Sequence, residues 1–202
     1  MADTITQEPV SFPSTDAETT IHGYIWRDEG CASPRGIIQV AHGMAEHIER
    51  YDDFARFLAS KGFIVGGYDH LAHGESVSQS TSWGELDPRN GANHLIEDVH
   101  RMRSYMLAHT PTGLPYFVFG HSMGSYIMRD YIVRHGDGLA GAILCGTGYV
   151  APIVSKAGNM LSRAIAAIRG KGYESKLLDS MAAGGFNKVI DDPRTEADWI
   201  SA

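Results

Sequence analysis

The stretch from Pro115 to Ser125, PYFVFGHSMGS, constrains the fold more than any other part of the chain. An apolar run ends there in Gly120-His-Ser-Met-Gly124, and residues compatible with a helix follow. If the run is a buried strand, Ser122 lies on a tight turn with its hydroxyl held clear of the backbone. Gly120 and Gly124 suit such a turn, because a side chain at either position would collide with neighbouring backbone. The pattern predicts that Ser122 is a nucleophile.

Short apolar runs alternate with amphipathic segments over the first 146 residues. Val10–Phe12 and Thr19–Trp26 flank the turn residues 13–16, which is typical of an antiparallel hairpin. The later runs resemble buried parallel strands, and the segments between them have helical spacing. The order predicts an α/β fold: a mostly parallel sheet of about six strands, with helices on both faces. We expect further strands at 36–41, 63–69 and 139–145, a strand before Gly120, and helices at about 51–61, 93–109 and after Ser122.

The composition excludes some classes of protein. The net charge is −7, whereas a nucleic-acid-binding protein needs a basic face. The N-terminal residues have neither the basic segment nor the apolar core of a secretory signal, and no apolar run could span a membrane. We therefore expect a cytoplasmic protein. Cys31 and Cys145 are expected to be unpaired thiols.

The pattern changes after Gly146. Residues 153–168 form an apolar helical stripe with no strand after it, so we divide the chain into a core at 1–148 and a helical segment at 149–202. Residues 151–188 hold six Lys or Arg (156, 163, 169, 171, 176 and 188) against Glu174 and Asp179. Two interpretations stay open: a helical piece that covers the core with a solvated basic face, or a lid that contacts anionic lipid.

A second constellation follows the strand at 36–41, where the sequence reads His42-Gly-Met-Ala-Glu-His47. A serine nucleophile that attacks a carbonyl needs two N–H donors for the developing oxyanion. The N–H of Met123 is one candidate, and the N–H of Met44 is the second, because Gly43 permits the unusual backbone that such a loop requires. Both groups would then lie at the carboxyl edge of the sheet with Ser122.

Three sequence motifs resemble those of a known family, the α/β-hydrolases, and within it the monoacylglycerol lipase and lysophospholipase group. They are HGMAEHIERY at 42–51, DHLAHGES at 69–76 and GHSMG at 120–124. The resemblance implies Ser122 as the nucleophile, the N–H groups of Met44 and Met123 as the oxyanion hole, and a cap over an acyl-binding pocket. It implies no cofactor. One departure is Ala72, where the family usually has glycine, and it is expected to shift the loop without affecting catalysis.

The resemblance also implies a catalytic acid and a histidine that these residues do not supply. No histidine follows His135, and the family's less common acid position reads Gly146-Thr-Gly-Tyr149. We therefore expect the chain to be the N-terminal part of the enzyme, without the strands that carry the acid and the histidine. The strand at 139–145 would then be a bare edge, which predicts self-association.

The histidines already present have other expected roles. His121 adjoins the nucleophile, but its position directs its side chain away from the hydroxyl, so we expect it to shape the pocket. His42, His47, His70 and His73 lie in two loops that should meet, and loop-bracing hydrogen bonds are the favoured interpretation. Their spacing matches no zinc pattern, so no metal is expected. Asp69 is expected to anchor its loop.

The main hypothesis is a serine hydrolase that cleaves monoacylglycerol-like or lysophospholipid-like carboxylic esters through an acyl-enzyme. The expected partner is this small ester, with lipid contact through the basic cap and no nucleic acid. One alternative is a catalytically inactive binding module that keeps the pocket, since the acid and base are missing. Another keeps the fold and changes the substrate to a peptide or a small aryl ester.

Overall fold

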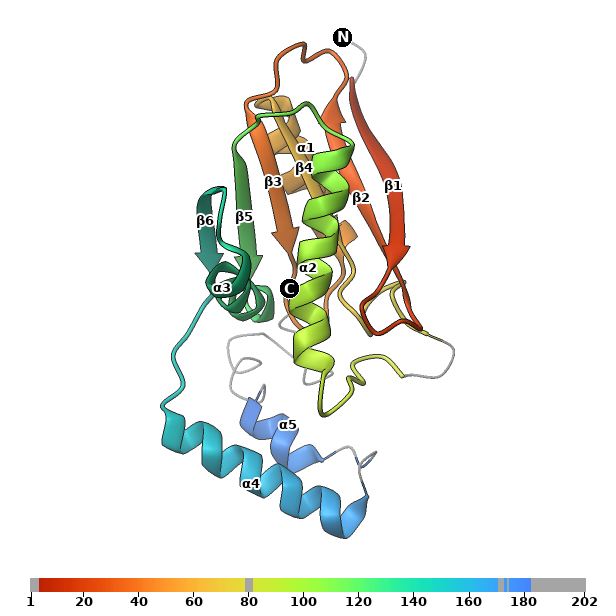
Figure 1. Ribbon diagram of the computed structural model, residues 1–202. Coiled ribbons are helices and arrows are strands. Elements are labelled where there is room, and N and C mark those ends of the chain that lie inside the picture. The colour runs from red at the N-terminus through yellow and green to blue at the C-terminus, as the bar shows by residue number, and fades with distance from the viewer. Residues whose placement is uncertain (1–3, 79–81, 171–172, 174, 183–202) are drawn as a thin grey trace, which may run out of the picture. The chain divides into compact units, whose positions relative to one another are not determined.

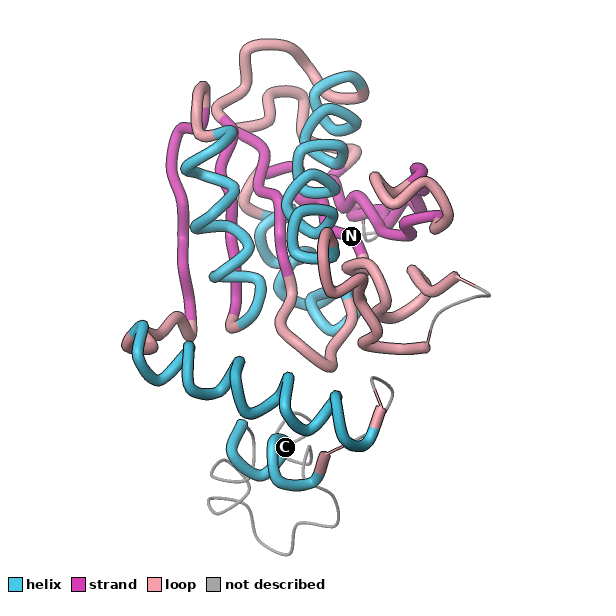
Figure 2. The backbone as a smooth tube through the Cα atoms, turned by 60° about the horizontal axis from the view of Figure 1, so that its bottom comes forward, coloured by secondary structure: helices cyan, strands magenta, loops and turns pink. Residues whose placement is uncertain are grey.

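The computed structural model describes residues 4–78, 82–170, 173 and 175–182. The chain divides into two compact units, Met1–Thr147 and Gly148–Ala202. The strands, drawn in magenta in Figure 2, all belong to the first unit, and the elements described in the second are helices.

The first unit is built on a six-stranded sheet with the strand order β1-β2-β4-β3-β5-β6 (Figure 1). Strands β1 and β2 form an antiparallel hairpin, and β2 is antiparallel to β4. The remaining neighbours, β4 with β3, β3 with β5 and β5 with β6, are all parallel. The predicted fold class and the predicted antiparallel start are confirmed. The strands are β1 (Ile5–Pro13), β2 (Thr20–Asp28), β3 (Gly36–Ala41), β4 (Phe63–Tyr68), β5 (Tyr116–His121) and β6 (Leu139–Cys145).

Helices cover both faces of this sheet, and successive residues of β3 show why. Ile37 points into a core shared with α2 (Gly91–Ala108) and α3 (Met123–His135), whereas Ile38 points into a second core with α1 (Asp52–Ser60). All six residues of β3 are buried, as a strand covered on both sides requires. In Figure 1, α2 runs in front of the sheet and α1 lies behind it.

A short 3₁₀ helix, η1 (Ile48–Tyr51), precedes α1 and was not predicted. The sequence pattern predicts a helix from about Tyr51, because the apolar spacing begins there. Ile48 is fully buried in the core beside α1, so the 3₁₀ turn brings one more apolar side chain under the sheet before the α-helix starts.

The second unit contains α4 (Pro152–Arg169) and α5 (Lys176–Ala182). The helical stripe predicted at 153–168 is confirmed by α4. Three charged residues of the predicted basic segment, Lys171, Glu174 and Lys188, lie outside the described residues. Among the helices that the structure describes, none combines the length and the apolar character needed to cross a membrane.

Candidate active site

Ser122 lies in the turn between β5 and α3, in the elbow formed by residues 120–124. It is the N-cap of α3 and has φ 49° and ψ −118°. A non-glycine residue with positive φ is strained, and the surrounding structure must hold it there. Strain of this kind at the tip of a strand-turn-helix is the expected geometry of an exposed serine nucleophile.

The two glycines of the elbow are required by close backbone contacts. A Cβ at Gly120 would lie 2.5 Å from the carbonyl oxygen of Gly124, so the start of α3 packs directly on the end of β5. A Cβ at Gly124 would collide with the carbonyl oxygens of Ala41 and His42 at the end of β3. The predicted steric role of both glycines is therefore seen in the structure.

Backbone pairing brings three strand ends to the elbow. Ala41 pairs with Gly120, and His121 pairs with Cys145. The N–H of Ser122 donates to the carbonyl oxygen of Cys145 over 2.9 Å, so the backbone of Ser122 is tied to the last residue of β6. The carboxyl ends of β3, β5 and β6 consequently form one edge around Ser122.

The loop after β3 approaches this elbow at Gly43. A Cβ at Gly43 would lie 3.1 Å from Cβ of Ser122, so a larger residue would crowd the Ser122 side chain. The next residue, Met44, is 65% exposed, and Ala45 has φ 57°. The loop thus turns sharply beside Ser122, where the N–H groups of Met44 and Met123 remain the predicted oxyanion donors.

Three of the four predicted loop histidines gather into one cluster. The ring centroids of His42 and His70 are 4.1 Å apart, and those of His42 and His73 are 5.5 Å apart. His47 instead lies exposed at the N-cap of η1. No group of three or more metal-ligating side chains suited to an ion occurs in the part of the chain that the structure describes.

The hydrogen bonds of His42 fix its protonation state. Its Nε2 accepts the N–H of His70 over 2.9 Å, and its Nδ1 donates to the carbonyl oxygen of Gly43 over 2.7 Å. Burial lowers the pKa of His42 to about 4, because a charged imidazole would lose its hydration there. Burial also lowers the pKa of His70. His42 is therefore a neutral brace that holds the loop at Gly43, which agrees with the expected loop-bracing role.

Asp69 has the anchoring role predicted for it. One carboxylate oxygen accepts the N–H of Ile48 over 2.7 Å, and the other accepts the N–H of Glu75 over 2.8 Å. The loop that follows contains Ala72 at φ 63°, a backbone conformation that glycine adopts without strain.

Glu46 contacts the candidate site, although the sequence pattern predicts no role for it. Its Oε1 accepts the N–H of Gly43 over 2.6 Å and lies 3.1 Å from Nδ1 of His121. His121 thus turns toward the loop after β3. The signal in the sequence was that Glu46 stands three residues after Gly43, within hydrogen-bond reach of the turn.

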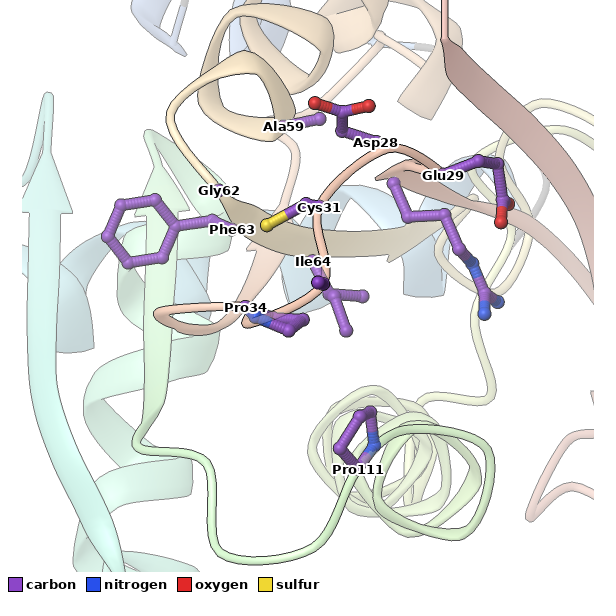
Figure 3. A pocket seen from close by; sticks show the side chains of 11 residues that line it. Asp28, Glu29, Cys31, Pro34, Ala59, Gly62, Phe63, Ile64 and Pro111 are labelled. Atoms are coloured by element: carbon purple, nitrogen blue, oxygen red, sulfur yellow. The ribbon is translucent and has the colours of Figure 1, made fainter.

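A hollow of about 200 Å³ is lined by residues other than those of the elbow, and Figure 3 shows side chains that line it. Arg27, Cys31, Phe63 and Pro111 are among the residues that line it. Phe63 begins β4, so this hollow lies at the amino ends of the parallel strands, whereas Ser122 follows a carboxyl end. Ligands of open α/β sheets bind at the carboxyl ends, and the hollow is not part of the candidate active site.

Comparison with known proteins settles the family. The family described as serine aminopeptidase, S33 (Hydrolase_4), matches residues 32–198. The chain belongs to this family of α/β-hydrolases. The resemblance to α/β-hydrolases inferred from the three sequence motifs is thereby confirmed.

The relatives of this S33-family chain include lipases and esterases. It is 31% identical over 122 residues to the monoacylglycerol lipase of Mycolicibacterium smegmatis. The aligned segment covers 60% of this chain and 40% of that lipase. It is 30% identical over 125 residues to human monoglyceride lipase, covering 59% of this chain and 36% of the human protein. Among solved structures, a thermostable carboxyl esterase from Bacillus coagulans in complex with glycerol is 36% identical to this chain, with a TM-score of 0.79. The match covers 97% of this chain and 61% of the esterase chain. The chain thus spans less than half the length of these two curated relatives.

Proposed function

We propose that Ser122 is the nucleophile of a carboxylic ester hydrolase whose substrates are monoacylglycerol-like or lysophospholipid-like esters. The observation that carries the proposal is the strained Ser122 backbone, with φ 49°, on a strand-turn-helix against which the Gly43 loop packs. The similarity to proteins named monoacylglycerol lipase, monoglyceride lipase and carboxyl esterase supports the ester as the substrate class.

The proposed reaction is acyl transfer to Ser122 and then to water. The Ser122 oxygen forms a bond to the ester carbonyl carbon, and the N–H groups of Met44 and Met123 donate to the oxyanion. The alcohol leaves with a proton, and water then releases the fatty acid from the acyl-enzyme. Ser122 must also lose its proton to a base. The residues from Gly136 to Ala202 include no histidine, so the proposal assigns this base to none of them.

The test is ester hydrolysis with a monoacylglycerol and with a p-nitrophenyl ester. Ser122→Ala should abolish turnover and labelling by a fluorophosphonate probe. Ser104→Ala is the matched control, because its hydroxyl donates to the carbonyl oxygen of His100 on the exposed side of α2. Measurable turnover that is equal in the parent chain and in Ser122→Ala would contradict the proposal.

Two other functions are outcomes of the same assay. The first is an inactive binding module that keeps the pocket, and strong, rapid labelling of Ser122 by the fluorophosphonate probe would count against it. Preferred cleavage of an aminoacyl p-nitroanilide favours a peptide substrate, which the aminopeptidase description of the family motivates.

We propose residues 149–202 as the helical cap, and α4 as its lipid-contacting part. Lys156, Arg163 and Arg169 lie on α4, together with the exposed apolar side chains of Ile153 and Ile168. Basic and apolar side chains on one helix suit an anionic membrane surface. Lys156→Gln with Arg163→Gln should weaken sedimentation with anionic vesicles and leave sedimentation with neutral vesicles unchanged. Equal binding to both vesicle types by the parent chain would contradict lipid contact through charge.

We also propose that β6 mediates self-association. Among the described strands it pairs with β5 alone, and its Ile143 is 52% exposed. An apolar strand with one open edge can pair with a second copy. Ile143→Lys should shift the chain to a smaller species in size-exclusion chromatography, and a monomeric parent chain would contradict the proposal.

A further inference from the structure

Glu46 makes contacts on both sides of the candidate active site. Its Oε1 accepts the N–H of Gly43, in the loop that carries Met44, and lies 3.1 Å from Nδ1 of His121, which precedes Ser122. The two contacts come from residues 78 positions apart in the sequence, and they converge on one oxygen atom. One carboxylate therefore joins the loop after β3 to the elbow after β5.

The surroundings hold this carboxylate in place. The Glu46 side chain is only 7% exposed. The Tyr51 hydroxyl approaches the same Oε1 at 3.4 Å, and Nε of Arg50 lies 3.6 Å from Oε2. Burial, followed by the charge of Glu46, raises the pKa of Tyr51, so the tyrosine stays a neutral donor. A buried carboxylate with a cation on one oxygen and N–H donors on the other keeps a fixed orientation.

This arrangement bears on the proposed oxyanion donors. The N–H of Gly43 is held by Glu46, so it is directed into the protein, and the peptide unit that follows carries the N–H of Met44. The carbonyl oxygen of Gly43 is held from the other side by Nδ1 of His42. With both polar groups of Gly43 engaged, the orientation of the Gly43–Met44 peptide is fixed before any substrate binds. Fixed donors are what stabilises an oxyanion without reorganisation cost.

We propose that Glu46 is a positioning residue that holds the N–H of Met44 in place beside Ser122. The inference rests on the proposed function of Ser122 and adds a residue that acts through Gly43 and His121. It does not require Glu46 to touch the substrate.

The experiment combines kinetics with NMR on three variants. Glu46→Ala removes the acceptor, and Glu46→Gln keeps an oxygen acceptor without the charge. Glu49→Ala is the matched control, because Glu49 is an exposed carboxylate three residues further along the same segment. Thermal unfolding of each variant separates a folding defect from a positioning defect.

With ester turnover established for the parent chain, Glu46→Ala should lower kcat by about 10- to 100-fold, which is less than the loss of an oxyanion donor itself. KM should change by less than about 3-fold, because the donor acts in the transition state. Glu46→Gln should recover part of the lost kcat, and Glu49→Ala should leave it unchanged. An unchanged kcat in Glu46→Ala overturns the proposal while the Ser122→Ala result leaves the proposed function standing.

The NMR measurement decides the question even if the parent chain turns over no ester. Glu46→Ala should move the amide resonances of both Gly43 and Ser122 and speed hydrogen exchange at Gly43 by at least about 10-fold. Glu49→Ala should leave these resonances in place. If Glu46→Ala moves Gly43 alone, or neither residue, Glu46 does not join the two segments and the proposal is wrong.

Discussion

Gly124→Ala tests the close packing that shapes the elbow. A Cβ at this position would lie 2.6 Å from the carbonyl carbon of Ala41 and 2.6 Å from the oxygen of His42. Ordinary contacts of a Cβ begin near 3.4 Å, and the carbonyl oxygen of Ala41 would be closer still, so α3 would have to move by at least about 0.8 Å. The crowded atoms are backbone atoms of β3 and the residue after it, and no flexible side chain can yield in their place.

Overpacking of a core costs about 1 to 3 kcal/mol, and the rigid neighbours place Gly124→Ala at the upper end, about 3 kcal/mol. For a chain of this size that loss lowers the melting temperature by about 6 to 12 °C. Gly158→Ala is the control, since Gly158 lies within α4 and an added Cβ would meet nothing within 4 Å. It should instead stabilise its helix by about 1 kcal/mol.

Differential scanning calorimetry of the parent chain and both variants measures these shifts. Labelling of Ser122 by the fluorophosphonate probe should slow in Gly124→Ala, because the displaced helix carries the N–H of Met123. A melting temperature within about 2 °C of the parent would show that α3 can withdraw from β3 at little cost. The steric argument for the elbow glycines would then be refuted.

Three further predictions follow from the strained backbone and from the buried histidine. Ser122→Gly should raise the free energy of unfolding by about 1 kcal/mol in urea titrations, because glycine accepts φ 49° without strain, while Ser122→Ala should give no such gain. Ala72→Gly should stabilise by a similar amount, about 1 kcal/mol, at φ 63°, and no gain would mean that the loop relaxes this strain. The pKa of His42 is lowered to about 4 in the folded chain, so stability from this group is complete above pH 6.5 and is lost as the pH falls toward 4. His42 should therefore account for about 2 kcal/mol of the stability lost on urea unfolding between pH 7 and pH 5, and the lowered pKa of His70 adds a further loss. His42→Gln should reduce the pH dependence by about its own share, and an equal slope in the variant would assign the effect elsewhere.

Much of the core was predictable because its strands are apolar and bounded by turn residues. The run Phe63–Asp69 and the small-residue run Leu139–Cys145 became β4 and β6 with nearly the predicted ends. The strained position of Ser122 followed from glycines whose spacing fits one kind of turn. These are local patterns, and each is decided within a dozen residues.

The role of Glu46 could not be predicted in the same way. A glutamate in a loop is usually solvated, and nothing near Glu46 in the sequence shows that His121 lies beside it. The contact depends on β3 and β5 being neighbours in the sheet, which places their carboxyl ends together. The 3₁₀ turn η1 was not predicted for a related reason. Ile48 is buried because it packs against β3 and β4, and this tertiary contact is not visible in the local sequence.

The hydrogen bond from Ser122 to Cys145 has a consequence for synthesis of the chain. The contacts described for the elbow come from the ends of β3, β5 and β6, and the last of these ends is Cys145. Translation proceeds from the N-terminus, and folding can begin on the part already released. A nascent chain that has emerged as far as Cys145 carries every partner in these contacts, so the elbow can reach its strained conformation while the helices of the second unit are still being made.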